Sequence, residues 1–444
     1  MTHLYARKKV QIDHDEETDT PDRPSHPSPS SRLTPSKSKD RGRKGSSELG
    51  WALVAVVGFI FLGLFLGYVL LHNQHRTVIS HVLKDPWGHG GGVLRGRAGF
   101  RHHFYTGSPR YVTVVMPSVV NQKGRMDRLE AIQDTWGPGA RSIFVVHNIS
   151  EFPQASHAVV SEESLPEDPY AYPQLLLVPP GIGFNDGLPR LYHTIRTVFE
   201  KVDPDFAFFV NDHTFVIPEH LCKYLKDRSP NEDLYAGHAM KNGKLVFNSG
   251  AAGYVLSRST MRKMMNTWDE RDPDCWVDPE AATSWLQGNP GLATVQCLES
   301  MGIKAFDTRA DSKWHRFHAF PLTRVVSGDV DDWYNKKHAQ VPGFSPSYDS
   351  LLSGEDCCAT DSVSFHYVEW RETKALFDIR GALLRNPKMS DRDLKTSLFA
   401  EWPASRKDSG FYSHPIPYED NREAWKPLLA TLRKISTRAT QQEC

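Results

Sequence analysis

A long apolar segment constrains this chain more than any other feature of its sequence. The segment runs from Trp51 to Leu71 and contains no charged side chain. As an α-helix that rises about 1.5 Å per residue, it would be roughly 30 Å long, which matches the hydrocarbon core of a bilayer. It starts too far into the chain, and is too long, for a cleaved signal peptide. The sequence therefore predicts a transmembrane helix over residues 49–71 rather than a buried core helix.

The positive charges around this segment predict its orientation. Basic residues crowd the preceding stretch, at Arg32, Lys37, Lys39, Arg41, Arg43 and Lys44. Over a similar distance after the segment, only Arg76 and Lys84 occur. Basic flanks stay in the cytoplasm, so we expect a single-pass type II membrane protein whose bulk lies in the secretory lumen. Over the whole chain, 53 Lys and Arg balance 53 Asp and Glu, which gives no reason to expect a nucleic-acid partner.

Composition divides the rest of the chain into three parts. Residues 1–48 are rich in Ser, Pro and charged side chains and predict a disordered cytoplasmic tail. Residues 72–108 are rich in Gly, His and Arg and predict a flexible stem; its irregularly spaced histidines do not favour a metal-binding tract. Residues 109–444 are expected to form the lumenal globular domain.

All six cysteines follow the apolar segment, at positions 222, 275, 297, 357, 358 and 444. In an oxidising lumen they are expected to form disulfides, although spacing alone does not reveal the pairing. Cys357 and Cys358 are adjacent, and we expect each to bond to a distant partner. No Cys-x-x-Cys pair occurs, which disfavours zinc. The sequon at Asn148 is compatible with the lumen.

Segments typical of strands and helices alternate from Tyr111 onward. Strands are predicted at 111–120, 142–147, 174–178 and 205–210, helices at 125–136 and 188–199, and a strand running into a helix at 254–265. Such alternation favours a mostly parallel sheet with helices on its faces. Ligands of these sheets lie beyond the carboxyl ends of the strands, which directs attention to Asn211, Asp212 and His213.

Three features could carry chemistry, and each has a structural alternative. Asn211-Asp212-His213 could hold Mn²⁺, or form a turn or N-cap. The small residues from Ser249 to Gly253 could let a ligand approach the backbone, or only permit tight strand packing; they are not a dinucleotide-binding fingerprint. His366, in a β-rich segment, could be a ligand or a satisfied core residue.

Taken together, these segments resemble a known family. FFVNDHTFVIPEHL, FNSGAAGYVLS and CCATDSVSFHYV occur in this order and look like those of the core 1 β-1,3-galactosyltransferases, within glycosyltransferase family 31, which includes the Fringe-type enzymes. RLEAIQDTW and DTRADSKWHRFHAF support the resemblance. It covers roughly residues 111–368 and leaves 369–444 unmatched.

The resemblance implies a fold, an activity and a location. The fold would be of GT-A type, a Rossmann-like α/β/α sandwich on a single-pass type II membrane anchor. The activity would be transfer of a sugar from a UDP-sugar with inversion, assisted by a divalent cation, normally Mn²⁺. We expect galactose as the sugar, GalNAc on a glycoprotein as the acceptor, and residence in the Golgi or ER membrane. Members of the family often pair, which leaves a homodimer open.

The resemblance also implies roles for individual residues. The implied nucleotide- or substrate-binding residues are Arg128, Asn211, Asp212, Gly250, Ala251, Ala252 and Gly253. The implied metal ligands are Asp212, His213 and His366. Trp314 or Tyr367 could stack on the sugar or the acceptor.

This sequence departs from the family pattern at two places. His213 and Asn211 stand where the family has acidic residues, and an imidazole brings no negative charge to a cation. Pro290 and Gly291 replace a Glu-Asp pair, one member of which is the expected base. Asp307 and Asp278 are our candidates for that base, with Asp274 and Glu280 as further acids nearby in sequence; each could instead be an exposed loop acid. These departures keep a second interpretation open, a non-catalytic folding chaperone or glycan-binding protein.

Overall fold

The structure of this chain is a computed structural model. It describes residues 109–118, 123–148, 150, 152, 158–160, 174–272, 275, 290–330, 334–335, 341, 344, 351–394, 396 and 422–436. The chain divides into two compact units, Met1–His75 and Arg76–Cys444. All described residues belong to the second unit. The predicted tail, transmembrane helix and stem lie outside them. Within the described ranges, no helix combines the length and apolar character needed to cross a bilayer.

The described elements follow one another in a mixed α/β order. In chain order they are β1 (Tyr111–Met116), α2 (Arg125–Asp134), β2 (Ser142–Val146), β3 (Ala158–Val160), β4 (Gln174–Leu177), α3 (Gly187–Thr197), the π-helical turn η2 (Val198–Val202), β5 (Phe206–Asn211), β6 (Phe215–Val216), α4 (Pro218–Lys226), β7 (Tyr235–Gly237), β8 (Ala239–Asn242), β9 (Leu245–Asn248), β10 (Tyr254–Ser257), α5 (Arg258–Asp269), α7 (Pro290–Ser300), β11 (Phe317–His318), α8 (Leu322–Ser327), η5 (Gly354–Asp356), β12 (Ser364–Phe365), α9 (Trp370–Arg385) and α11 (Arg422–Ile435). Every strand and helix predicted above is present among them, with ends shifted by a few residues.

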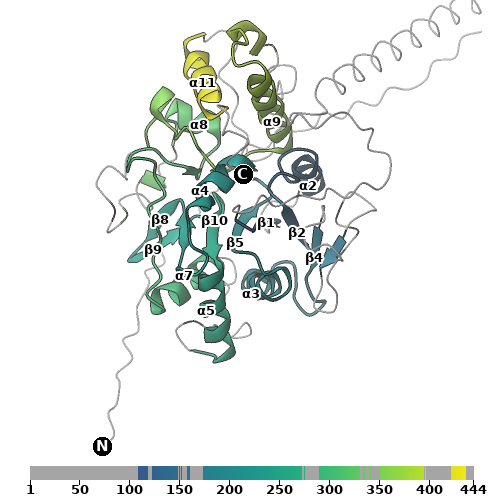
Figure 1. The fold of residues 1–444 in the computed structure, drawn as a ribbon. Helices are drawn as coiled ribbons and strands as arrows, with labels where there is room; N and C mark the ends of the chain where they lie inside the picture. Colours follow the sequence, from purple (N-terminus) through teal and green to yellow (C-terminus); the bar gives the residue numbers. More distant parts are fainter. Residues whose placement is uncertain are drawn as a thin grey trace, which may run out of the picture. The chain divides into compact units, whose positions relative to one another are not determined.

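A seven-stranded sheet in the order β3-β4-β2-β1-β5-β10-β7 forms the centre of this unit. The strands from β3 to β5 in that order pair in parallel, and β10 and β7 close one edge antiparallel. The prediction of a mostly parallel sheet is thus confirmed. This mixed α/β architecture fits a GT-A-like fold (Figure 1).

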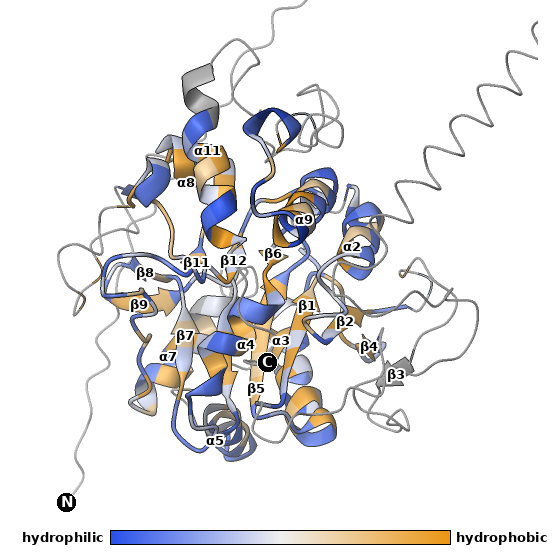
Figure 2. Ribbon diagram, turned by 45° about the horizontal axis from the view of Figure 1, so that its top comes forward, coloured by the Kyte–Doolittle hydropathy of each residue, from blue (hydrophilic) through white to orange (hydrophobic). Residues whose placement is uncertain are grey.

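Alternating side chains of the strands supply two separate apolar layers. On β1, Tyr111 and Val115 pack with α2, α4, α9 and α11. Val112 and Val114 point to the opposite face and pack with α3, α5 and α7. Figure 1 shows α2 and α9 on one side of the strands and α3 and α5 on the other. Figure 2 shows β1 and β5 in hydrophobic colours, as expected for strands covered on both faces.

A smaller sheet, ordered β11-β12-β6, lies next to the end of β5 in the chain path. β6 begins four residues beyond β5, and its Phe215 pairs antiparallel with Phe365 of β12. His318 on β11 pairs with the same Phe365. This pairing brings the residues that follow β12 close to the residues that follow β5.

The family resemblance did not extend to residues 369–444, yet the described residues of this region pack into the core. Leu376 of α9 and Leu432 of α11 belong to the same buried cluster as α2. Arg380 of α9 forms an ion pair with Glu219 of α4 and donates to the carbonyl of Ile435. Residues 369–394 and 422–436 are therefore part of the folded unit and not an appended tail.

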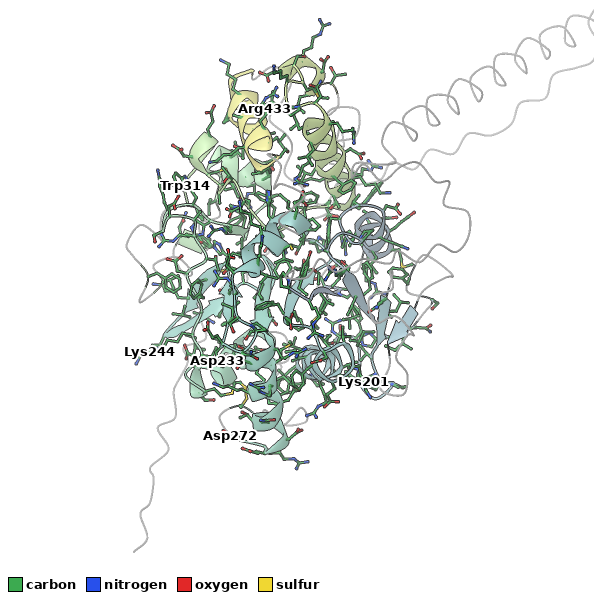
Figure 3. The ribbon with its side chains drawn as sticks, viewed as in Figure 1. Lys201, Asp233, Lys244, Asp272, Trp314 and Arg433 are labelled. Carbon is green, nitrogen blue, oxygen red and sulfur yellow. A yellow bond between two sulfur atoms is a disulfide. The ribbon has the colours of Figure 1, made fainter. Side chains whose placement is uncertain are left out.

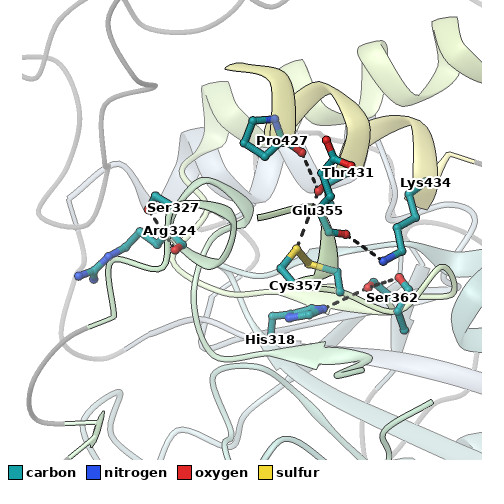
Figure 4. Close-up of a disulfide and its surroundings, with 11 residues drawn as sticks. His318, Arg324, Ser327, Glu355, Cys357, Ser362, Pro427, Thr431 and Lys434 are labelled. Carbon is teal, nitrogen blue, oxygen red and sulfur yellow. Dashed lines mark hydrogen bonds between the residues drawn. A yellow bond between two sulfur atoms is a disulfide. The ribbon is translucent and has the colours of Figure 1, made fainter. Parts of the chain in front are cut away.

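The cysteine pairing corrects one expectation. Cys357 and Cys358 are bonded to each other, not to distant partners. Cys275 is bonded to Cys297 of α7, and Cys222 is also in a disulfide. Figure 4 shows the surroundings of Cys357: its Sγ lies 3.9 Å from Thr431 Oγ1 of α11, and Lys434 donates to the Glu355 carbonyl. The adjacent pair is buried next to η5 and α11.

Candidate functional site

The candidate site lies at the carboxyl ends of β1 and β5. The chain passes from β1 to β2, β3 and β4 on one side of β1, and then crosses to β5 on the other side. Met116 and Asn211, the last residues of β1 and β5, are in register. In open α/β sheets, such a reversal of strand order opens the crevice where ligands bind. Asp212, which the sequence placed in the site, therefore sits at the switch point.

Asp212 is held by groups of the protein on both carboxylate oxygens. Its Oδ1 accepts a 2.7 Å hydrogen bond from the backbone N–H of Ser118, just after β1. Its Oδ2 lies 2.8 Å from both Nε and Nη2 of Arg128, on α2. The Arg128 side chain is 1% exposed and that of Asp212 is 0% exposed. Arg128, predicted as a substrate-binding residue, is thus the buried counter-charge of Asp212.

Asn211 links the end of β5 to His366. Its Oδ1 lies 3.0 Å from the backbone N–H of His213 and 3.0 Å from Thr214 Oγ1, in the manner of an Asx-turn. Because the backbone N–H of His213 donates to this oxygen, the amide NH₂ must point the other way. It points at His366, with Nδ2 3.2 Å from Nε2 of the imidazole. The amide therefore donates to the imidazole, a role that an aspartate at position 211 could not perform.

Glu369 is a member of this site that the sequence reasoning missed. It is the residue that caps α9, and its Oε1 lies 3.5 Å from Nδ1 of His213. Its Oε2 lies 3.9 Å from Nη1 of Arg128. The backbone N–H of Val368 also donates to the carbonyl of His213. The sequence did contain a signal for it. Glu369 lies three residues after His366 and directly precedes a helical pattern that begins at Trp370, and both features could have placed it near the site.

We call this group of side chains the β1/β5 corner. It consists of Arg128, Asn211, Asp212, His213, His366 and Glu369. All six are buried or nearly so, with His213 at 2% and His366 at 4% exposure. Burial, and next the charge of His213, keep the pKa of His366 well below its ordinary value, so this imidazole is neutral near pH 7.

A second carboxyl lies one helical turn beyond Glu369. Burial, and next the charge of Glu369, raise the pKa of Glu372 to about 8, while the backbone N–H of Glu369 acts in the opposite direction. That contact from the third residue of a helix back to the capping residue is half of a capping box. Glu372 is therefore protonated at neutral pH.

The small-residue segment joins the corner through its backbone. Thr214 Oγ1 lies 2.8 Å from the carbonyl of Ala251, and Ser364 Oγ donates to the carbonyl of Ala252. Gly253 has a φ of +88°, and a Cβ there would lie 2.5 Å from the Phe208 ring. A Cβ on Gly250 would meet nothing nearer than 3.8 Å. The carboxyl half of the segment is thus fixed by strand packing, whereas Gly250 has room around it.

The candidate bases are distributed differently. Asp307 is half-buried and pairs with Arg309 through both oxygens, at 3.0 Å to Nε and 2.7 Å to Nη2. Phe306, next to it, bridges to Ala236 of β7, two strands away from β5. Asp278, Asp274 and Glu280 lie outside the described residues. Pro290 and Gly291 are the first residues of α7, where proline is favoured because its missing N–H costs nothing.

The two aromatic candidates lie in different places. Tyr367 adjoins the β1/β5 corner, with its ring centroid 3.8 Å from that of His366, and has a φ of +60°, which is strained for a residue with a side chain. Trp314 is half-buried beside Lys313 and Lys434, with ring-to-Nζ distances of 4.6 and 5.8 Å. Figure 3 shows Trp314 near the outer side of the unit, with Arg433 of α11 above it.

The implied Mn²⁺ does not fit the donor atoms of the corner. Asp212 has both oxygens bonded by protein groups, Nε2 of His366 accepts from Asn211, and Nδ1 of His213 faces Glu369. Within the described ranges, no three side chains of His, Cys, Asp or Glu are arranged to hold a metal ion. The predicted ligands do come together, but as partners of neighbouring protein groups.

Three known sugar transferases resemble this chain. It is 29% identical over 199 residues to glycoprotein-N-acetylgalactosamine 3-β-galactosyltransferase 1 of Xenopus laevis, covering 42% of this chain and 50% of that protein. It is 24% identical over 254 residues to UDP-GlcNAc:βGal β-1,3-N-acetylglucosaminyltransferase 7 of Mus musculus, covering 50% of this chain and 57% of that protein. The rat protein of the same name is 23% identical over 227 residues, 44% of this chain and 52% of that protein.

These similarities cover only part of each protein. The chain spans about half the length of the curated relatives that it matches. No protein-family model matches it. The relatives nevertheless share one linkage type, β-1,3, and one reaction class, with two different sugars. The chain is therefore similar to β-1,3-galactosyl- and β-1,3-N-acetylglucosaminyltransferases, the class of enzymes that its motifs resemble.

Proposed function

We propose that this chain is a glycosyltransferase that moves galactose from UDP-galactose to the 3-hydroxyl of GalNAc on a glycoprotein, with inversion at the anomeric carbon. One observation carries the proposal. Three motifs far apart in the sequence meet at the switch point of the sheet, through Thr214 with Ala251 and Asn211 with His366, and Asp212 joins them to Ser118 after β1. The named relatives perform reactions of this class.

The residues of the corner prepare the site by fixing its backbone. The buried pair of Arg128 and Asp212 ties α2 to the ends of β1 and β5, so the backbone at the carboxyl ends of these strands is held in place. Rigid placement of a donor and an acceptor supplies much of the rate enhancement in a displacement reaction. Bound Mn²⁺ would neutralise the leaving diphosphate in the wider family. Since the corner does not fit the cation, the mechanism proposed for this chain contains no step that depends on it.

The acceptor hydroxyl must lose a proton as it attacks the anomeric carbon. In the corner, Glu369 is the carboxylate without a guanidinium contact shorter than 3.9 Å, and it lies beside His213. Asp307 is neutralised by Arg309. We therefore rank Glu369 with Asp278 as the residues to examine first for this role, ahead of Asp307.

The activity test uses the purified protein with two matched donors. UDP-galactose with a GalNAc-bearing peptide should release UDP and form a β-1,3-linked disaccharide. UDP-GlcNAc with a galactoside acceptor, the pair named for the rodent relatives, should give much less product. Preference for the second pair would replace galactose with GlcNAc in the proposal. No transfer from either donor, together with no UDP binding by calorimetry, would remove the enzymatic proposal.

A second candidate function is favoured by the substitutions themselves. His213 stands at an acidic position of the family, and Pro290-Gly291 stands where the base is expected. A folding chaperone or glycan-binding protein that keeps the fold without catalysis would tolerate both changes. UDP should then fail to raise the thermal unfolding temperature, whereas a ligand present at 100 times its Kd stabilises by about 2.7 kcal/mol.

Location and assembly complete the proposal. We place the chain in the Golgi or ER membrane, anchored through residues 49–71 with the described unit in the lumen, because of its apolar segment and its flanking charges. Accessibility of an epitope at either end to protease in sealed microsomes tests this orientation. A homodimer is proposed from the family alone, and sedimentation of the purified protein tests it.

A further inference from the structure

We infer that this chain binds its nucleotide sugar without a divalent cation, because both oxygens of Asp212 and Nε2 of His366 in the β1/β5 corner are already engaged by neighbouring protein groups. The inference rests on the proposed function for the identity of the nucleotide. Whether the β1/β5 corner takes a cation is a property of its own side chains. It can therefore be tested without UDP and without activity.

The carboxylate of Asp212 is the first element of this inference. A cation needs a lone pair directed at it, and both oxygens of Asp212 already accept hydrogen bonds, at 2.7 Å from Ser118 and 2.8 Å from Arg128. The guanidinium of Arg128 is buried and balances the carboxylate charge. A divalent cation bound to Asp212 would lie close to this fixed positive charge in a poorly screened environment, which opposes its entry.

The two imidazoles are the second element. Nε2 of His366 accepts from the Asn211 amide, and Nδ1 of His213 lies 3.5 Å from the Glu369 carboxylate. Carboxylate, carbonyl and water oxygens also suit Mn²⁺ better than an imidazole does. The two departures from the family pattern thus act in the same direction. The Asn211 amide occupies Nε2 of His366, and His213 stands in place of a carboxylate that could bind the cation.

The roles of Asn211 and His213 depend on each other. The amide of Asn211 can face His366 only because its oxygen is turned toward His213 N–H and Thr214 Oγ1. An aspartate at position 211 would have a carboxylate oxygen in place of the amide NH₂. The lone pair of His366 Nε2 would then lose the hydrogen bond that it accepts from Asn211. A return to aspartate at 213 would supply a carboxylate at the end of the strand. Both changes are needed to rebuild a cation site.

The decisive experiment titrates MnCl₂, and separately ZnCl₂, into the detergent-solubilised full chain in metal-free buffer. We expect no binding of either ion up to millimolar concentration. The double variant Asn211→Asp/His213→Asp should bind Mn²⁺ at least tenfold more tightly than the unmodified chain. Binding of either ion by the unmodified chain that is lost in His213→Ala would overturn the inference. A double variant that gains no affinity would overturn the assignment to these two residues.

UDP calorimetry separates this inference from the proposed function. In EDTA and in Mn²⁺, the Kd for UDP should agree within about twofold, since no protein ligand tethers the ion. A tenfold gain with Mn²⁺ that disappears in His213→Ala would contradict the inference. If UDP binds under neither condition, the proposed function fails, and the titration of the metal ions alone still decides whether the corner takes a cation.

Discussion

β5 and the turn that follows it are equally buried but are held in place by different forces. Phe206, Phe208 and Val210 point into one apolar layer, and Ala207 and Phe209 into the other. Asp212 and His213, which directly follow the end of β5, are no more than 2% exposed. The strand is fixed by non-directional packing, whereas the turn depends on hydrogen bonds and ion pairs with defined partners. The stability of the strand should therefore respond to the size of a substituted side chain. The stability of the turn should respond to the loss of a hydrogen-bond or ion-pair partner.

The largest expected effect tests the turn against the strand. Arg128→Met leaves the Asp212 carboxylate buried without its counter-charge, so the free energy of unfolding should fall by about 3–5 kcal/mol. Phe208→Leu, a large-to-small change within the apolar layer, should cost only about 1–2 kcal/mol. Urea denaturation of the purified protein measures both. Equal losses would show that the turn is held by packing as well, and would remove the contrast.

The next effect tests the boundary between the two regions at the small-residue segment. Gly253→Ala places a Cβ on a backbone with φ of +88° and against the Phe208 ring, so we expect a loss of about 2–4 kcal/mol. Gly250→Ala is the matched control, because its Cβ finds space, and should change stability by less than about 1 kcal/mol. Thermal unfolding with far-UV circular dichroism distinguishes them. A destabilised Gly250 variant would contradict the assignment of packing to Gly253.

A pH series tests the charge of the buried carboxyls beside the corner. Between the ordinary pKa of 4.5 and about 8, Glu372 is protonated in the folded protein and ionised in the unfolded one. The folded state then holds one more proton, so stability should fall as pH rises, by up to about 1.4 kcal/mol per pH unit. Below pH 4.5 both states are protonated, and the penalty disappears.

Glu372→Gln isolates this contribution from the other titrating groups. The difference in unfolding free energy between Glu372→Gln and the unmodified protein should grow with pH across this range and be small at pH 4. A difference independent of pH would mean that Glu372 is ionised in the fold, and that the charged network extends beyond Glu369.

The smallest effect concerns a single neutral contact of the turn. Thr214→Val keeps the shape but removes the hydroxyl between Ala251 and Asn211, and should cost about 1 kcal/mol. The same variant should alter UDP binding by more than the stability loss suggests, because it loosens the Asn211 amide that faces His366. Denaturation and calorimetry on one preparation measure both quantities. Unchanged UDP affinity would place Thr214 in the scaffold alone.

Local patterns in the sequence predicted the parallel strands and their helices. Apolar runs such as Phe206–Val210 are covered on both faces, and the stripe in α3 has helical spacing, so neighbouring residues carry the signal. The switch point follows from strand order, and Asp212 was found there. The partner of Asp212 could not be deduced, because Arg128 is 84 residues away and its helix reaches the site only through the sheet.

The remaining errors have a similar origin. Glu369 was missed because its importance comes from His213, 156 residues earlier in the numbering but adjacent in space through the pairing of β6 and β12. The expectation that Cys357 and Cys358 each bond to a distant partner was wrong, because the two are bonded to each other. Helix α9 was left unassigned, although its apolar residues face the same core as α2.

The bond between Cys357 and Cys358 has a consequence for how the disulfides contribute to stability. A crosslink restricts the unfolded chain by an amount that grows with the logarithm of the length that it encloses, and adjacent residues enclose almost nothing. Cys275 and Cys297 are separated by 22 residues, and closing that loop is worth about 3 kcal/mol in the chain-entropy account. Of these two bridges, a reducing agent should therefore weaken the molecule almost entirely through the second. The bond between Cys357 and Cys358 instead restricts the conformation of the one peptide unit between them, next to α11.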